Sequence, residues 1–221
     1  MKGELLMKRI LCYGDSNTWG VDPVNSGESI NSAARFSEKE RWPLVLEKEL
    51  GQGYRVLAAG LGGRTTVFDD SISDGRNGAK YLEVAFRTHD PVDYIIIMLG
   101  TNDTKDFFNV SAEVISWGLE RLIRDLKYYM KDSLSEKAEI LIVSPIYVGK
   151  NKEGKYYCGF SCDSEKKSKK LAGYYKNIAQ TYGCEFLDAA EVASPSKEDG
   201  IHLGKKDHFK LAKAIADKMR G

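Results

Sequence analysis

Five short apolar runs alternate with five longer amphipathic stretches, and this alternation restricts the possible folds more than any other feature of the chain. Short continuous apolar runs fit buried strands, whereas apolar residues spaced three and four apart fit helices. Strands are expected at 8–14, 54–60, 93–100, 138–145 and 184–190, and helices at 41–51, 79–89, 111–131, 164–183 and 205–221. Strand–helix alternation predicts a parallel five-stranded sheet with right-handed crossovers and helices on both faces.

The composition predicts an ordinary globular protein, with 42% hydrophobic and 29% charged residues among 221. No repeat or low-complexity linker interrupts the chain, so one domain over residues 1–221 is expected. A formal net charge of +1 favours neither nucleic acid nor an acidic membrane surface as a partner. No apolar run approaches the roughly 20 residues of a membrane helix. The N-terminal stretch has too few apolar residues for a signal peptide, so a cytoplasmic location is expected.

The four cysteines predict neither a metal site nor a disulfide framework. Cys12 and Cys184 lie in apolar, strand-like runs, which is typical of small core residues. Cys158 and Cys162 are four residues apart, but no further ligands of suitable spacing lie nearby. All four are therefore expected to be reduced thiols.

Polar and glycine-rich segments follow most of the predicted strands. The carboxyl ends of parallel strands meet at one rim of the sheet, where open α/β sheets bind their ligands. This rim should receive GDS (14–16), GLGGRTT (60–66), GTNDTKD (100–106) and EDGIHLG (198–204). It would then carry a serine, a glycine-rich turn, an asparagine, and a histidine three residues after an aspartate.

Acyl transfer needs this set of groups. The Ser16 hydroxyl is a poor nucleophile unless a base takes its proton; His202 can be that base, and Asp199 can orient the imidazole. The oxyanion of the tetrahedral intermediate needs fixed donors. The Ser16 N–H at a strand-to-helix turn, the unobstructed N–H of Gly63 and the Asn102 amide are the candidates, with the dipole of the following helix adding to them.

The four blocks resemble those of the SGNH (GDSL-type) hydrolases. They occur in the family order, each after a predicted strand: GDS at 14–16, GGRT at 62–65, GTND at 100–103 and DGIH at 199–202. The wider matches GDSNTWG, DGRNGAKYL and IIIMLGTNDTK are similar to the bacterial arylesterase and acyltransferase branch. The resemblance implies a flavodoxin-like three-layer α/β/α sandwich, a Ser16–His202–Asp199 triad, oxyanion donors at Ser16, Gly63 and Asn102, and no metal or organic cofactor. It also implies a small-molecule ester as substrate and makes homo-oligomers plausible.

Several alternatives compete with these assignments. His89 lies near a helix end and His208 lies within the last helical pattern, so His202 is preferred as the base. Asp188 and Asp207 compete with Asp199, and the DGIH spacing favours Asp199. Gly62 competes with Gly63 as the oxyanion donor. The glycines at 60–63 lack the third glycine of a dinucleotide-binding fingerprint, and no phosphate-binding P-loop motif occurs.

Three further residues are candidates for contact with substrate: Asp15, Trp19 and Arg64. For Asp15 the alternative is to brace the rim loops by accepting backbone N–H bonds. For Trp19, and likewise Trp42, the alternative is packing beneath the first helix. For Arg64 the alternative is an ion pair with Asp69 or Asp70. Asp103 is expected to brace the rim loops, as Asp15 would in its alternative role.

The leading hypothesis is therefore a serine esterase that hydrolyses, or transfers, short acyl groups of small, aryl or sugar esters through an acyl-enzyme. A carbohydrate acetyl esterase and a lysophospholipase are alternatives with the same mechanism. The segment 145–163 carries no motif, and its aromatic residues are candidates for stacking on a sugar or an acyl chain. A non-catalytic flavodoxin-like binding module is the alternative from a different class, but it does not account for all four blocks on one rim.

Overall fold

A computed structural model describes residues 7–26 and 34–221, and it confirms the predicted parallel sheet. The five strands lie in the order β2-β1-β3-β4-β5, and every neighbouring pair is parallel. The strands are β1 (Lys8–Gly14), β2 (Tyr54–Gly60), β3 (Tyr94–Met98), β4 (Glu139–Ser144) and β5 (Glu185–Asp188).

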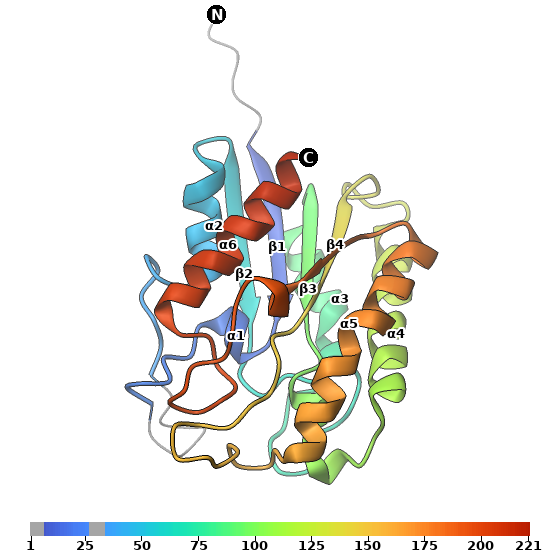
Figure 1. The fold of residues 1–221 in the computed structure, drawn as a ribbon. Helices are drawn as coiled ribbons and strands as arrows, with labels where there is room; N and C mark the ends of the chain where they lie inside the picture. The colour runs from blue at the N-terminus through green and yellow to red at the C-terminus, as the bar shows by residue number, and fades with distance from the viewer. Residues whose placement is uncertain (1–6, 27–33) are drawn as a thin grey trace, which may run out of the picture.

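Helices cover both faces of the sheet, as the alternation predicts (Figure 1). One face carries α2 (Trp42–Leu50) and α6 (Lys205–Arg220), and the other carries α3 (Gly78–His89), α4 (Ala112–Met130) and α5 (Cys162–Tyr182). The predicted α/β/α sandwich is therefore correct.

Alternate residues of the central strands supply two separate cores. Leu11 and Tyr13 of β1 join the cluster beneath α3, α4 and α5, whereas Ile10 and Cys12 join the cluster beneath α2 and α6. Because successive side chains of a strand point to opposite faces, a strand covered on both sides must be apolar at nearly every position. This requirement explains the continuous apolar sequence of β1 and β3.

The chain reverses its direction of travel across the sheet at β1. From β1 it moves outward to β2, and it then returns to form β3 on the other side of β1. Ligands of open α/β sheets bind at such a switch point, outside the carboxyl ends of the strands. The first helix after β1, α1 (Ser16–Trp19), is a single turn. The expected dipole of a full helix at Ser16 is therefore reduced to that of one turn.

The single turn α1 lies directly against the end of β2. A Cβ atom at Gly60 would lie 2.2 Å from the Trp19 nitrogen, which is far inside contact distance. Glycine at position 60 therefore permits the approach of α1, and with it the placement of Ser16 above the sheet.

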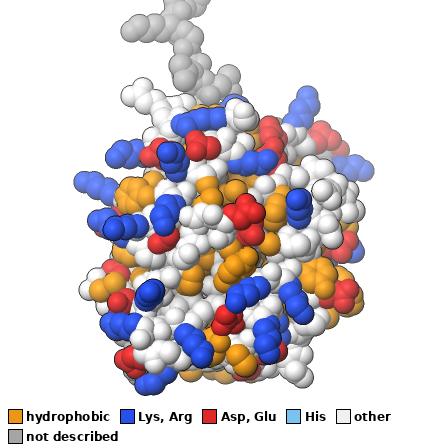
Figure 2. Space-filling view, in the orientation of Figure 1, with side chains coloured by type: hydrophobic (Ala, Val, Ile, Leu, Met, Phe, Trp, Pro, Cys, Tyr) orange, Lys and Arg blue, Asp and Glu red, His pale blue; other side chains and the backbone are white. Residues whose placement is uncertain are grey.

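The surface carries charges of both signs, and the cysteines are unpaired, as the sequence predicts. Acidic and basic side chains are interspersed over the face shown in Figure 2. All four cysteines are free thiols, with Cys12 buried in the core and Cys158 and Cys162 exposed. Within residues 7–26 and 34–221, none of the helices combines the length and apolar character that a bilayer crossing requires.

His208 is a buried histidine between α2 and α6. It lies in α6 with no measurable exposure, its Nδ1 accepts a hydrogen bond from the Trp42 N–H at 3.3 Å, and the Phe36 ring contacts it edge-on at 5.3 Å. Burial lowers the pKa of His208 to about 3, so the ring stays neutral in the folded protein. Its interactions are those of a core residue.

This burial predicts a loss of stability in acid. An unfolded histidine has a pKa near 6.5, so below that pH the unfolded state binds a proton that folded His208 does not, and the free energy of unfolding falls. Between pH 7 and pH 4.5 the contribution should reach about 3 kcal/mol. Urea unfolding of His208→Gln at both pH values should show a smaller decrease than the wild type. Burial lowers the pKa of the half-buried His89 as well, so His89→Gln should change the pH dependence in the same direction but less than His208→Gln does. An unchanged pH dependence in His208→Gln contradicts the assignment.

Candidate active site

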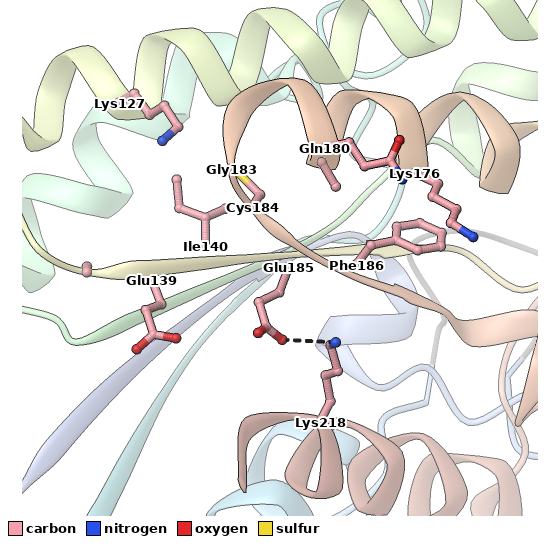
Figure 3. Close-up of a pocket in the computed structure, with 12 residues that line it drawn as sticks. Lys127, Glu139, Ile140, Lys176, Gln180, Gly183, Cys184, Glu185, Phe186 and Lys218 are labelled. Atoms are coloured by element: carbon pink, nitrogen blue, oxygen red, sulfur yellow. Dashed lines mark ion pairs between the residues drawn. The ribbon is translucent and has the colours of Figure 1, made fainter. Parts of the chain in front are cut away.

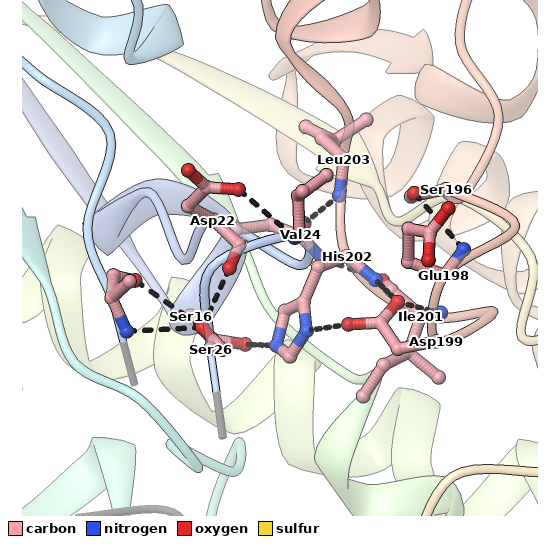
Figure 4. Close-up of polar contacts among 12 residues, drawn as sticks. Ser16, Asp22, Val24, Ser26, Ser196, Glu198, Asp199, Ile201, His202 and Leu203 are labelled. Atoms are coloured by element: carbon pink, nitrogen blue, oxygen red, sulfur yellow. Dashed lines mark hydrogen bonds and ion pairs between the residues drawn. The ribbon is translucent and has the colours of Figure 1, made fainter. Parts of the chain in front are cut away.

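The structure brings Ser16, His202 and Asp199 together at the carboxyl rim of the sheet (Figure 4). The Ser16 Oγ lies 3.0 Å from Nε2 of His202, and the opposite ring nitrogen, Nδ1, lies 2.6 Å from Oδ2 of Asp199. The serine and the histidine are 186 residues apart in sequence. The arrangement is a nucleophile, a base within hydrogen-bond reach, and a carboxylate that orients the base.

The turn after β1 sets the position of Ser16. Asp15 caps the turn, because its Oδ1 accepts the Asn17 N–H at 2.9 Å. This is the bracing role expected for Asp15. Burial raises the pKa of the Asp15 carboxyl, and the Asn17 N–H partly opposes that shift. Ser16 is the first residue of the helical turn, so its own N–H has no acceptor within the helix.

Asp199 holds both the imidazole and its own loop. Its Oδ1 accepts the N–H groups of Ile201 and His202, both at 3.0 Å, while Oδ2 faces the ring. Burial alone would raise the pKa of Asp199, but the hydrogen bonds and charge of His202 and these two N–H groups outweigh it and lower the pKa. The carboxylate therefore remains ionised and can stabilise an imidazolium.

The three predicted oxyanion donors lie in segments that follow β1, β2 and β3. Gly63 has φ +76°, a conformation that favours glycine, and its N–H donates to no protein acceptor in the described part of the chain. Asn102 is buried, and its Nδ2 donates to the Arg64 carbonyl at 3.1 Å. One amide hydrogen of Asn102 is thus used to fix the side chain, which leaves the second for a ligand.

Asp103 braces the same rim from below. It is fully buried, and its Oδ1 accepts the N–H of Thr66 at 2.8 Å and is also bonded to the Thr66 hydroxyl. Burial raises the pKa of Asp103 to about 6. The carboxyl ties the turn after β3 to the turn after β2, which is the structural role expected for it.

Arg64 and Trp19 lie beside the nucleophile turn. The Arg64 Nη1 donates to the carbonyls of Gly14 and Ala59 at 2.8 and 2.5 Å, and the guanidinium lies over the Tyr13 ring at 4.2 Å. The alternative of an ion pair with Asp69 or Asp70 is wrong, because neither carboxylate pairs with Arg64 within the described residues and Asp69 pairs with Lys80 instead. Trp19 is half-buried beneath the Arg35 guanidinium, 4.6 Å from the ring centroid. Contact of Asp15, Trp19 or Arg64 with substrate stays a prediction.

The competing residues have other positions. His89 ends α3 at the amino end of the sheet. Asp188 accepts bonds from the Ser144 hydroxyl and the Ala190 N–H. Trp42 is packed in the core between α2 and the sheet, so the packing alternative is correct for it.

The segment 145–163 carries no sequence motif, but it follows a predicted strand and is expected at the rim, and it lies there against the histidine loop. Gly149 N–H donates to the Gly200 carbonyl at 2.8 Å, and Val148 and Phe160 form a small buried cluster with Ile201. The Tyr157 ring lies edge-on to His202, with centroids 6.0 Å apart. This segment therefore packs against the His202 loop and borders the imidazole ring that is the candidate base.

Asn17 also supports that loop, a contact that no sequence motif indicated. Its Nδ2 donates to the Ile201 carbonyl at 3.2 Å, and its Oδ1 accepts the Leu203 N–H at 2.8 Å. The side chain is 2% exposed. Only two features of the sequence pointed to such a role for Asn17: its position directly after Ser16, and an amide side chain that can both donate and accept a hydrogen bond.

A separate cavity of about 720 Å³ lies at the other end of the sheet (Figure 3). It is lined by residues at the start of β4 and β5 and at the end of α5, among them Glu139, Glu185 and Gly183. Lys218, which also lines it, forms an ion pair with Glu185 at 3.4 Å. The thiol of the cavity, Cys184, has a pKa raised by burial, which opposes reactivity. The cavity therefore lacks the nucleophile and base of the rim site.

A hydrogen-bonded serine, imidazole and carboxylate on the carboxyl rim of a parallel α/β sheet is the set of groups that a hydrolase of the serine type uses. The chain belongs to the GDSL-like lipase/acylhydrolase family, whose model matches residues 12–209. It is a carboxylic ester hydrolase of that family.

Solved structures similar to this chain agree with the family. The native aryl esterase of M. smegmatis is 35% identical with a TM-score of 0.89, over 96% of this chain and 98% of that one. Est24, a carbohydrate acetylesterase from Sinorhizobium meliloti, is 34% identical with a TM-score of 0.85, over 96% and 98% of the two chains. Comparison with curated protein sequences gave no significant match.

Proposed function

We propose that this esterase cleaves short-chain esters of small, aryl or sugar alcohols through an acyl-enzyme on Ser16. The observation that carries the proposal is the continuous hydrogen-bonded series from Ser16 Oγ through His202 to Asp199, at 3.0 and 2.6 Å. The group that starts the reaction and the group that accepts its proton are already within bonding distance.

In the first half-reaction, Ser16 Oγ attacks the ester carbonyl carbon while His202 Nε2 takes the hydroxyl proton. A C–O bond forms, and the carbonyl electron pair moves to oxygen to give a tetrahedral oxyanion. Asp199 stabilises the imidazolium. Collapse of the intermediate breaks the bond to the alcohol, which leaves with the proton held by His202.

The oxyanion would be held by the N–H groups of Ser16 and Gly63 and by the Asn102 amide. The Asn102–Arg64 and Asp103–Thr66 bonds fix the turns after β2 and β3 relative to each other, and the Arg64 Nη1 bond to the Gly14 carbonyl ties them to the end of β1, next to Ser16. Fixed donors need no reorganisation as charge develops, which is why they stabilise the transition state more than the ground state.

In the second half-reaction, water or another alcohol attacks the acyl carbon while His202 takes its proton. The acyl–Ser16 bond breaks, and the serine regains a proton from the imidazolium. Water gives the free acid, and an alcohol gives a new ester. Both outcomes use the same groups.

Two observations favour a small acyl group. Ser16 and His202 are only 8% and 7% exposed, and Tyr157 lies against the imidazole, which favours narrow access to the nucleophile. The similar enzyme from M. smegmatis is described as an aryl esterase and that from S. meliloti as a carbohydrate acetylesterase. Acetylated sugars are therefore the second substrate class that we propose.

A substrate panel tests this proposal. Initial rates should be measured with p-nitrophenyl acetate, butyrate and octanoate, and with glucose pentaacetate in a pH-stat. We expect kcat/KM for the acetate to exceed that for the octanoate at least about tenfold, because a narrow site rejects added methylenes. Preference for the octanoate would favour a lysophospholipase-like enzyme, and failure to cleave any ester would favour a non-catalytic binding module.

A further inference from the structure

Asn17 joins the two halves of the proposed catalytic apparatus. Its backbone belongs to the turn that presents Ser16, and its N–H is fixed by the Asp15 carboxylate at 2.9 Å. Its side chain contacts the residues on either side of His202, namely Ile201 and Leu203, which are 184 and 186 positions away. Asn17 is the next residue in sequence to the nucleophile, and its amide binds the backbone next to the base on both sides.

The amide is suited to this contact in a way that other side chains are not. Its carbonyl oxygen accepts the Leu203 N–H, and its NH₂ group donates to the Ile201 carbonyl. Aspartate has the same shape but cannot donate, so it would place two oxygens against each other at Ile201. Alanine would leave the Leu203 N–H and the Ile201 carbonyl without these partners in a buried site.

From this geometry we infer that Asn17 is a positioning residue of the esterase reaction, which sets the distance between Ser16 Oγ and His202 Nε2. The inference rests on the proposed function, since it assigns the imidazole as the base. Asp199 fixes the orientation of the ring, and 145–163 packs against the loop through Val148 and Phe160. Asn17 alone of these contacts ties the loop directly to the nucleophile turn.

The test compares Asn17→Ala and Asn17→Asp with the wild type in hydrolysis of p-nitrophenyl acetate. A displacement of about 1 Å between reacting groups can cost about 10²-fold in rate, so kcat should fall by about that factor with KM little changed. The rate of covalent labelling by a fluorophosphonate should fall in parallel, because labelling needs the same proton transfer. Asn17→Asp keeps the acceptor for the Leu203 N–H and loses only the donor to the Ile201 carbonyl, and the thermal midpoint and circular dichroism of both variants show whether each is folded.

Ser135→Ala is the matched control. The buried Ser135 side chain also makes two contacts, in which its hydroxyl accepts the Val92 N–H at 2.7 Å and donates to Asp90, but at the amino end of the sheet. It should lower the thermal midpoint to a similar extent and leave kcat unchanged. If folded Asn17 variants also keep kcat within about threefold of the wild type, Asn17 is purely structural and the inference is overturned.

A double-mutant cycle with His202→Ala makes the test specific. If Asn17 acts through the imidazole, its replacement should cost nothing further in the His202→Ala background. An equal additional loss in that background contradicts the inference. An inactive, unlabelled wild-type protein would instead contradict the proposed function, so the two failures are distinguishable.

Discussion

Replacement of Ser16 by alanine is expected to lower kcat for p-nitrophenyl acetate by about 10⁴- to 10⁶-fold, since it removes the proposed nucleophile. The fold should be retained, because no described hydrogen bond of the Ser16 hydroxyl other than that to His202 supports the structure. Steady-state kinetics, together with the thermal midpoint of both proteins, measure the two effects separately.

Labelling provides the control for this variant. Wild-type protein should bind a fluorophosphonate covalently, with the modified peptide containing residue 16, and Ser16→Ala should not. Ser26, whose hydroxyl bonds to the Asp22 carbonyl at 2.6 Å, lies on the neighbouring loop and offers a matched serine. Ser26→Ala should label normally; activity or labelling that survives in Ser16→Ala would place the nucleophile elsewhere.

Asp199→Asn is expected to lower kcat by about 10⁴-fold with little effect on KM. The asparagine can still accept the N–H groups of Ile201 and His202 through Oδ1, so the loop should keep its position. Its NH₂ group, however, cannot accept the Nδ1 proton, which favours the wrong tautomer and leaves the imidazolium without its anionic partner. Kinetics of the purified variant, with circular dichroism as a check on folding, measure the effect.

Asp188→Asn separates this role from a general need for a carboxylate at the end of a strand. Asp188 ends β5, the strand that precedes the histidine loop, but it contacts Ser144 and Ala190 rather than the imidazole. It should lose stability and keep its turnover. The assignment of Asp199 would be wrong if Asp188→Asn caused the greater loss of kcat.

The sequence predicts the sheet well because each apolar run in the sequence coincides with a segment that packs against helices in the folded protein. The strands β1 and β2 begin and end where the apolar runs do. For β3 the run 93–100 is longer than the strand Tyr94–Met98, because its last apolar residue, Leu99, continues into the turn that presents Asn102. The helix α5 begins two residues before its predicted start, since Ser161 forms a capping box with Ser164.

The candidate site was predictable only in part. Ser16, Asp199 and His202 occur in short motifs, so their types and local spacing carry a chemical signal. The contact of Asn17 with the loop of His202 joins positions 184 and 186 residues apart, which no local pattern encodes. Arg64 illustrates the same limit. Proximity in sequence indicated Asp69 or Asp70 as an alternative partner, whereas in the folded protein Arg64 donates to two backbone carbonyls and lies over the Tyr13 ring.

The distance in sequence between Ser16 and His202 also affects how activity arises during synthesis. The hydroxyl leaves the ribosome 186 residues before the proposed base, which follows only after the five strands of the sheet have been made. A nascent chain would therefore remain inert toward cellular esters until residues 199–203 dock on the completed sheet. Recovery of hydrolysis during refolding would report this last docking step, and not the earlier formation of the β1–β2 pair.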